Sequence, residues 1–106
     1  MGNKTPMELL KQFAPDFAQN QMQEKSLIFE NEKYQKVPNK YKMLVGIGVA
    51  SALGSDTCTQ MWTNMAKQNG VSNEEIVEAM QVARYMKQAT VNDTIANSLK
   101  LLEGEK

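Results

Sequence analysis

Histidine is absent from the 106 residues of this chain. Histidine is the commonest general base near neutral pH and the commonest protein ligand of transition metals. Its absence argues against zinc hydrolases and against hydrolases that use a serine and a histidine together. We expect neither a metal ion nor an organic cofactor.

Cysteine is nearly absent as well, because Cys58 is the single one in the sequence. A lone cysteine cannot form a disulfide within the chain. The first residues, MGNKTPMELL, also lack the basic region, apolar run and small-residue cleavage site of a secretory signal. Both features predict a cytoplasmic protein.

An excess of charge of one sign and a long apolar run are also missing. Twelve Lys and Arg residues balance twelve Asp and Glu residues, so the net charge attracts neither nucleic acid nor an anionic membrane. The longest uncharged apolar stretch, residues 43–53, is much shorter than the roughly 20 residues of a membrane-spanning helix. We therefore expect no nucleic-acid or membrane partner. One local cluster, in which lysines alternate with Tyr34 and Tyr41, superficially suggests nucleic-acid contact. We interpret it instead as a solvated loop; its lysines are Lys33, Lys36, Lys40 and Lys42.

Helical patterns fill the chain. Thr5 and Glu8 form a capping box that predicts a first helix ending near Ala14. Pro15 is suited to the first position of a second helix, which its apolar spacing extends to about Glu30.

The middle of the chain predicts a loop over residues 31–36 and a third helix that begins near Pro38. Residues 43–53 carry no charge, so we expect this helix to be surrounded by protein on nearly all sides, at the centre of the core. Gly46 and Gly48 within it indicate either a close approach of a neighbouring backbone or room for a pocket.

The second half of the chain carries two further cap signals. Ser55 is placed to cap a fourth helix that ends at Gly70, with Cys58 at its third position. Ser72 and Glu75 form a capping box before a fifth helix. A sixth helix is predicted from Thr90, with Asp93 as its box partner. The sequence thus predicts an all-α orthogonal bundle of about six helices, in one domain over residues 1–106.

The segments KYKMLVGIGVASALGSDTCTQMW and NGVSNEEIVEAMQVARYM carry a family resemblance. They resemble the core of the carboxymuconolactone decarboxylase and AhpD-like alkylhydroperoxidase family, in which a glutamate precedes a Cys-x-x-Cys-x-x-x-His motif. The resemblance covers roughly residues 38–88. It implies a helical protomer that assembles as a homo-oligomer, either a trimer or a hexamer.

The resemblance places Cys58 at the family's second cysteine and Ser55 at its first. Trp62 stands at the histidine and Met43 at the glutamate. In family members with two cysteines, the second attacks a peroxide, the first resolves it, and a dithiol partner reduces the pair. Here the resemblance leaves Cys58 as the candidate nucleophile, with a thiol or dithiol as reductant and with the proton relay missing.

Each candidate residue also has a structural interpretation. The start of a helix favours a Cys58 thiolate and Asp56 opposes it, whereas a lone cysteine is commonly a small buried hydrophobic residue. Ser55 is expected chiefly as a cap. Cys58, Met61 and Met65 share a spacing that could hold Cu(I), and core filling is the alternative for these methionines.

Met43, Met61, Trp62 and Arg84 are the candidate contacts of a substrate or ligand. Arg84 could hold a carboxylate or phosphate in bidentate fashion, or it could form a salt bridge to a nearby acid. Three functions stay open: a thiol-dependent peroxidase that uses Cys58, a non-catalytic oligomer that binds a ligand or partner, and a lyase acting on a small carboxylated lactone.

Overall fold

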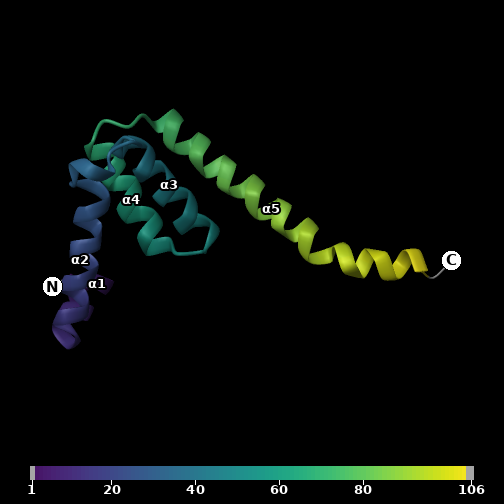
Figure 1. Ribbon diagram of the computed structural model, residues 1–106, viewed down its shortest axis with the longest axis horizontal. Coiled ribbons are helices and arrows are strands. Elements are labelled where there is room, and N and C mark those ends of the chain that lie inside the picture. The colour runs from purple at the N-terminus through teal and green to yellow at the C-terminus, as the bar shows by residue number, and fades with distance from the viewer. Residues whose placement is uncertain (1, 105–106) are drawn as a thin grey trace. The chain divides into compact units, whose positions relative to one another are not determined.

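The structure is a computed structural model that describes residues 2–104, and all the regular secondary structure in this part is helical (Figure 1). The predicted all-α class is confirmed. Five α-helices and one short 3-10 helix follow in the order α1 (Pro6–Phe13), α2 (Pro15–Phe29), η1 (Glu32–Tyr34), α3 (Asn39–Ala52), α4 (Asp56–Gln68) and α5 (Asn73–Gly104).

The chain divides after Asn39 into two compact units. In the first unit, the Thr5 side chain accepts the backbone N–H of Glu8, and the Glu8 carboxylate accepts the N–H of Thr5. This is the predicted capping box. The expected limits of the first two helices are confirmed, because α1 ends at Phe13 with Ala14 as its C-cap, and α2 begins at Pro15 and ends at Phe29.

The second unit contains α3, α4 and α5. Two glycines with positive φ make the turns around α4: Gly54, at +80°, precedes it and Gly70, at +81°, follows it. Ser55 then caps α4, because its hydroxyl accepts the N–H of Cys58 at 3.3 Å. The start of this helix and the place of Cys58 in its first turn are as predicted.

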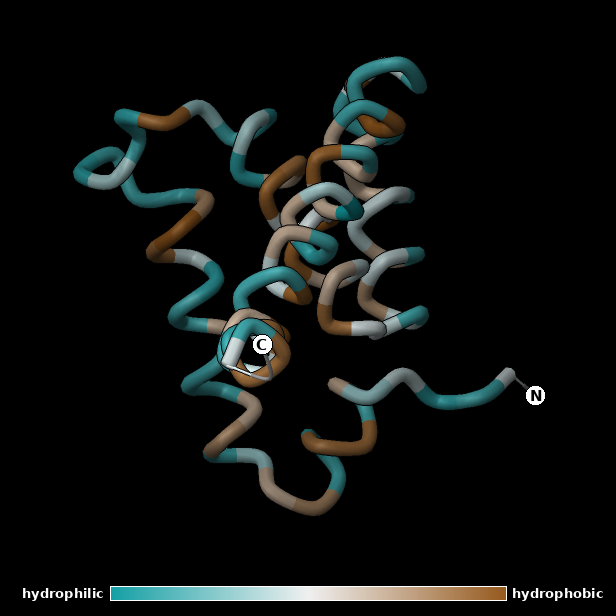
Figure 2. Tube along the Cα trace, turned by 90° about the vertical axis from the view of Figure 1, so that its right-hand side faces the viewer, coloured by the Kyte–Doolittle hydropathy of each residue, from teal (hydrophilic) through white to brown (hydrophobic). Residues whose placement is uncertain are grey.

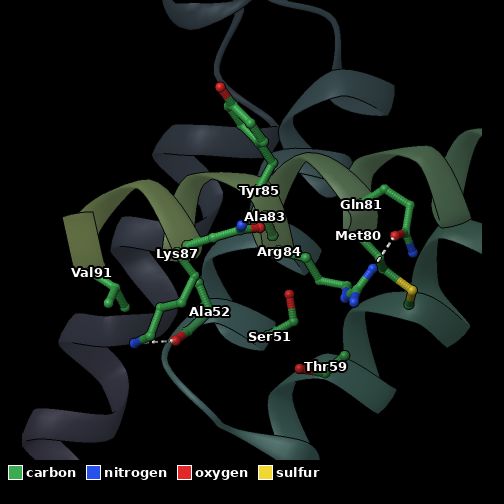
Figure 3. A pocket seen from close by; sticks show the side chains of 11 residues that line it. Ser51, Ala52, Thr59, Met80, Gln81, Ala83, Arg84, Tyr85, Lys87 and Val91 are labelled. Carbon is green, nitrogen blue, oxygen red and sulfur yellow. Dashed lines mark hydrogen bonds between the residues drawn. The ribbon is translucent and has the colours of Figure 1, made fainter.

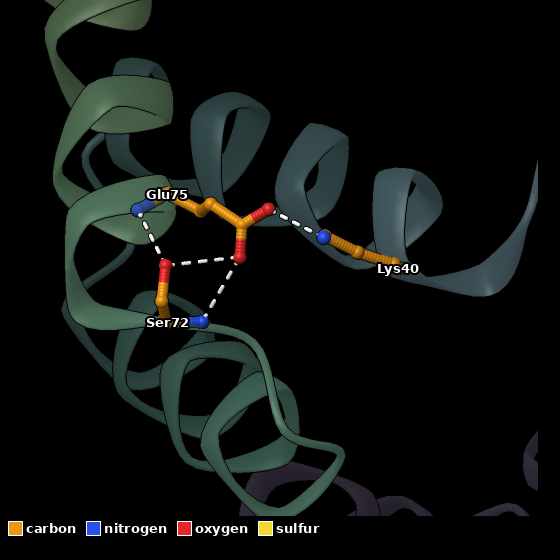
Figure 4. A network of polar contacts seen from close by, with 3 residues as sticks. All are labelled: Lys40, Ser72 and Glu75. Atoms are coloured by element: carbon orange, nitrogen blue, oxygen red, sulfur yellow. Dashed lines mark hydrogen bonds and ion pairs between the residues drawn. The ribbon is translucent and has the colours of Figure 1, made fainter.

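A polar network fixes the start of α5 (Figure 4). The backbone N–H of Glu75 donates to the Ser72 hydroxyl at 3.1 Å, and the Ser72 N–H donates to the Glu75 carboxylate at 3.1 Å. This confirms the predicted capping box. Lys40, from the first turn of α3, adds an ion pair to Glu75 at 2.5 Å. The Lys40 ammonium and the two Ser72 donors lower the pKa of Glu75 to about 2.

The predicted sixth helix is not separate. α5 runs without a break from Asn73 to Gly104, a length of about 48 Å at 1.5 Å per residue. Thr90 does not act as a cap, because its hydroxyl donates to the carbonyl of Lys87 one turn earlier. A threonine that bonds back to the preceding turn is compatible with a helix interior. The prediction of a break at Thr90 was therefore wrong.

The apolar helix α3 is buried along one face, not all round. Met43, Ile47 and Ala50 are buried at spacings of four and three residues. Val45 and Val49 on the other side are 62% and 54% exposed. The prediction of burial on nearly all sides is thus wrong for this chain by itself, because the described residues cover one stripe of the helix.

The core of the second unit draws on α3, α4, α5 and the α4–α5 connection. Ile47 and Ala66 have no exposed surface, and Val71 and Ile76 are each 4% exposed. Hydrophobic and hydrophilic segments alternate along the helices (Figure 2), as expected for helices with one buried face. No helix within residues 2–104 combines the length and apolar character needed to cross a bilayer.

Candidate functional site

The Cys58 thiol lies at the third position of α4 and is exposed. Helix α4 holds it there because the Ser55 cap fixes the first turn. The alternative of a buried cysteine therefore does not describe the chain by itself. The residue is open to solvent in the described chain.

The polar groups around Cys58 mostly serve the helix. The Thr59 hydroxyl donates to the carbonyl of Ser55 at 2.7 Å, and the Gln60 amide donates to the Asp56 carboxylate at 3.0 Å. Ser55 acts as a cap, in agreement with its structural interpretation. Among the residues described, no three His, Cys, Asp or Glu side chains gather to hold a metal ion.

Trp62 lies against Gly46 of α3. A methyl group added to Gly46 would lie 3.8 Å from two carbons of the indole, at ordinary van der Waals distance. Met43 is one turn earlier on α3 and is 6% exposed. Both side chains thus occupy interior or partly buried positions on the helices α3 and α4.

Arg84 lies elsewhere, in a groove formed by α3, α4 and α5 of the second unit (Figure 3). The groove has a volume of about 890 Å³. Arg84 donates from Nη1 to the Gln81 side-chain oxygen at 2.7 Å. No carboxylate within residues 2–104 forms an ion pair with it, so the salt-bridge interpretation is wrong for the described chain.

Several residues of this groove were not singled out from the sequence. Ser51 and Ala52 come from the end of α3 and Thr59 from α4, while Lys87 and Gln88 follow Arg84 on α5. The spacing of Arg84, Lys87 and Gln88 places them on one helix face, and this signal was present in the sequence.

The model of the carboxymuconolactone decarboxylase family matches residues 15–96, which is most of the chain. The chain belongs to this family. No curated protein and no solved structure matches it at a significant level.

As a carboxymuconolactone decarboxylase family member, the chain differs from the pattern stated above at three of four positions. Cys58 is retained and exposed, whereas Ser55 serves as the helix cap. Met43 is buried and Trp62 is half-buried against α3. The positions at which the resemblance expects the glutamate and the histidine of a proton relay therefore hold the apolar side chains of Met43 and Trp62.

The remaining candidates do not gather with Arg84. Met61 on α4 is 47% exposed and Met65 is half-buried. Cys58, Met43, Met61 and Trp62 are not among the residues that line the Arg84 groove. The second unit of this family member thus offers two separate features, an exposed thiol and a cationic groove.

Proposed function

We propose that this family member is a thiol-dependent peroxidase with one cysteine, in which Cys58 is the nucleophile. The observation that supports the proposal is the exposure of Cys58 in the first turn of α4. An exposed sulfur is needed twice in such a mechanism. A peroxide must reach it first, and an external thiol must reach the oxidised product afterwards.

The chemistry balances with a peroxide and two equivalents of thiol. The Cys58 thiolate attacks the outer peroxide oxygen, the O–O bond breaks, and the alkoxide leaves and takes up a proton as alcohol. The cysteine becomes a sulfenic acid. One external thiol converts the sulfenic acid to a mixed disulfide with loss of water. A second external thiol attacks this mixed disulfide, which restores the Cys58 thiol and releases the two external thiols as a disulfide.

The surroundings of Cys58 set the expected rate. Buried Met43 cannot accept or deliver a proton, and a general base commonly contributes 10²- to 10⁴-fold to a rate. We therefore expect slow turnover, in which solvent supplies the proton for the leaving alkoxide. The absence of a second cysteine makes each turnover depend on the external thiol.

The experiment is peroxide consumption by the native protein with a small thiol as reductant. Cys58→Ser should abolish the consumption, and the conservative change Thr57→Ser, one residue earlier in the same turn, should leave it unchanged. A sulfenic-acid probe followed by mass spectrometry should label Cys58 after mild peroxide. Consumption by Cys58→Ser at the native rate would refute the proposal, as would an unlabelled Cys58.

We further propose that the protein is a homo-oligomer, with a trimer or a hexamer as the expected forms. Exposed apolar side chains on α3 and α5 support this, because an apolar surface that stays exposed in a single chain commonly marks a site of contact with another protein. They include Val45, Val49, Val82 and Met86.

A further inference from the structure

We propose that the groove between α3, α4 and α5 binds a small organic oxyanion, with Arg84 as the main contact of its charged end. Cys58 does not line this groove, although its neighbour Thr59 does, and the proposal does not depend on peroxidase activity. The groove is lined by Ser51, Ala52, Thr59, Met80, Gln81, Ala83, Arg84, Tyr85, Lys87, Gln88 and Val91.

The charge of the lining favours an anion. Arg84 and Lys87 contribute two positive charges, and no aspartate or glutamate lines the groove. Arg84 is bonded to the neutral amide of Gln81, so its charge has no carboxylate partner in the described chain. A guanidinium carries five N–H donors, and the bond to Gln81 uses one. The others are available for a planar or tetrahedral oxyanion.

Lys87 has one bond that belongs to the fold. Its ammonium donates to the carbonyl of Ala52 at 3.0 Å, at the end of α3 where helix carbonyls lack partners. An ammonium has three donors, so two remain. The hydroxyls of Ser51 and Thr59 already donate to backbone carbonyls, at 3.0 and 2.7 Å. Figure 3 shows the Lys87 ammonium extending toward Ala52 and the Arg84 guanidinium extending the other way, toward Gln81. The main donors for the charged end of an anion are therefore those of Arg84, and Lys87 adds positive charge to the lining.

The rest of the groove suits an apolar body. Met80, Arg84 and Val91 are spaced by four and seven residues on α5, so apolar groups lie on both sides of the guanidinium along one helix face. Figure 3 shows the Arg84 side chain extending toward the side of the groove where Ser51 and Thr59 lie. A volume of about 890 Å³ falls within the usual range for small-molecule sites. The ligand class is an aryl or alkyl chain with a carboxylate or phosphate end.

The test is a titration of the full-length protein with benzoate, phenyl phosphate and neutral benzyl alcohol, followed by NMR chemical shifts. At least one anion should bind saturably with shifts centred on the groove, and benzyl alcohol should not. Binding of benzoate alone identifies a carboxylate site, and binding of phenyl phosphate alone identifies a phosphate site. Arg84→Gln should weaken binding about tenfold, the scale of one hydrogen bond between charged groups.

The matched control is Lys100→Gln, which removes one exposed positive charge from the same helix outside the groove. It should leave the affinity unchanged, and so should Cys58→Ser. Circular dichroism establishes that each variant is folded; Arg84 is exposed and bonds one side chain, so its replacement should not disturb folding. Equal weakening by Arg84→Gln and Lys100→Gln would overturn the proposal, because it would indicate diffuse charge attraction. No saturation by either anion up to about 10 mM would also overturn it.

Discussion

Met43 is 6% exposed at the position where the family resemblance expects a glutamate. A carboxylate at such a site would need a partner, and Trp62 has replaced the histidine that the resemblance expects. The two changes are consistent with each other, because an apolar pair can be buried without hydrogen bonds. At the scale of single residues, the chain has the thiol and lacks the groups that the resemblance expects to exchange protons with it.

We predict that Met43→Glu destabilises the fold at neutral pH by about 3–5 kcal/mol, the cost of an unpaired buried charge. Met43→Leu, which keeps an apolar side chain of similar volume, should cost less than about 1.5 kcal/mol. Urea unfolding followed by Trp62 fluorescence measures both. Equal unfolding midpoints for the two variants would mean that this position reaches water, contrary to its burial.

The Glu75 network makes a second prediction, on the dependence of stability on pH. Its pKa falls from the ordinary value of 4.5 to about 2 in the folded chain, chiefly through the hydrogen bond from Lys40. A lowered folded-state pKa means that the ionised form stabilises the fold above pH 4.5, and that this stabilisation is lost as the pH falls toward 2. Native protein and Glu75→Gln should therefore differ in Tm near neutral pH and converge in acid.

Thermal unfolding at several pH values tests this prediction, with Glu78→Gln as control, since Glu78 is an exposed glutamate of the same helix. The pair of Lys40 and Glu75 is itself partly exposed, so added salt should reduce the effect. A Tm difference that stays constant from neutral pH to acid would show that the Lys40–Glu75 pair does not form in solution.

The sequence predicted these local features well, because a cap needs partners three residues apart. Thr5 with Glu8, Ser55, and Ser72 with Glu75 were all predicted from spacing. The contact of Lys40 with Glu75 joins residues far apart in the chain, and no local pattern indicates it. The same limit applies to the groove, because Thr59 and Arg84 line it from separate helices that only the packing of the chain brings together.

At the scale of whole helices, α3 departs from good helix composition at Gly46 and Gly48. A methyl group at Gly48 would lie 3.8 Å from the Ala83 Cβ and 3.9 Å from the Ala79 carbonyl oxygen of α5. These are ordinary contact distances, as they are for Gly46 against Trp62. The close approach predicted from the sequence is present, and it leaves room for an alanine.

We therefore predict that Gly46→Ala and Gly48→Ala each stabilise the protein by about 0.5–1 kcal/mol, the difference in helix propensity. Gly54→Ala should instead destabilise it by about 1–2 kcal/mol, because Gly54 has φ near +80°. Chemical denaturation of the three variants separates these effects. Loss of stability in Gly48→Ala would show that α3 and α5 pack more closely in solution than in this structure.

Two predictions made from the sequence at this scale were wrong, for different reasons. Thr90 was given a cap role because it resembles a capping residue, yet nothing before it ends the helix, and Pro and Gly are absent from Val71 through Glu103. Helix α3 was expected to be buried on nearly all sides because residues 43–53 carry no charge, and composition does not tell whether the same chain or another molecule covers an apolar face. Helix identity could be predicted from the sequence, whereas helix length and the partner of an apolar face could not.

At the scale of the whole molecule, one apolar groove stands out in the second unit. It lies between α3 and α5, has a volume of about 430 Å³, and all its lining residues are apolar or small: Leu44, Val45, Gly48, Val49, Ala52, Ala79, Val82, Ala83 and Met86. Val82 and Met86 are 56% and 58% exposed there. A second copy of the chain that covers this surface would give each apolar side chain a partner, which is the basis of the proposed homo-oligomer.

We predict that the native protein elutes with three or six times the mass of one chain when size-exclusion chromatography is combined with light scattering. Val82→Asp should lower the assembled mass toward that of one chain, because it places an unpaired carboxylate in the apolar interface. Asn92→Asp adds the same charge at an exposed polar position of α5 outside this groove and should leave the mass unchanged. A native mass of one chain across a wide concentration range would refute the assembly. Equal masses for Val82→Asp and Asn92→Asp, both still oligomeric, would place the interface on another surface of the chain.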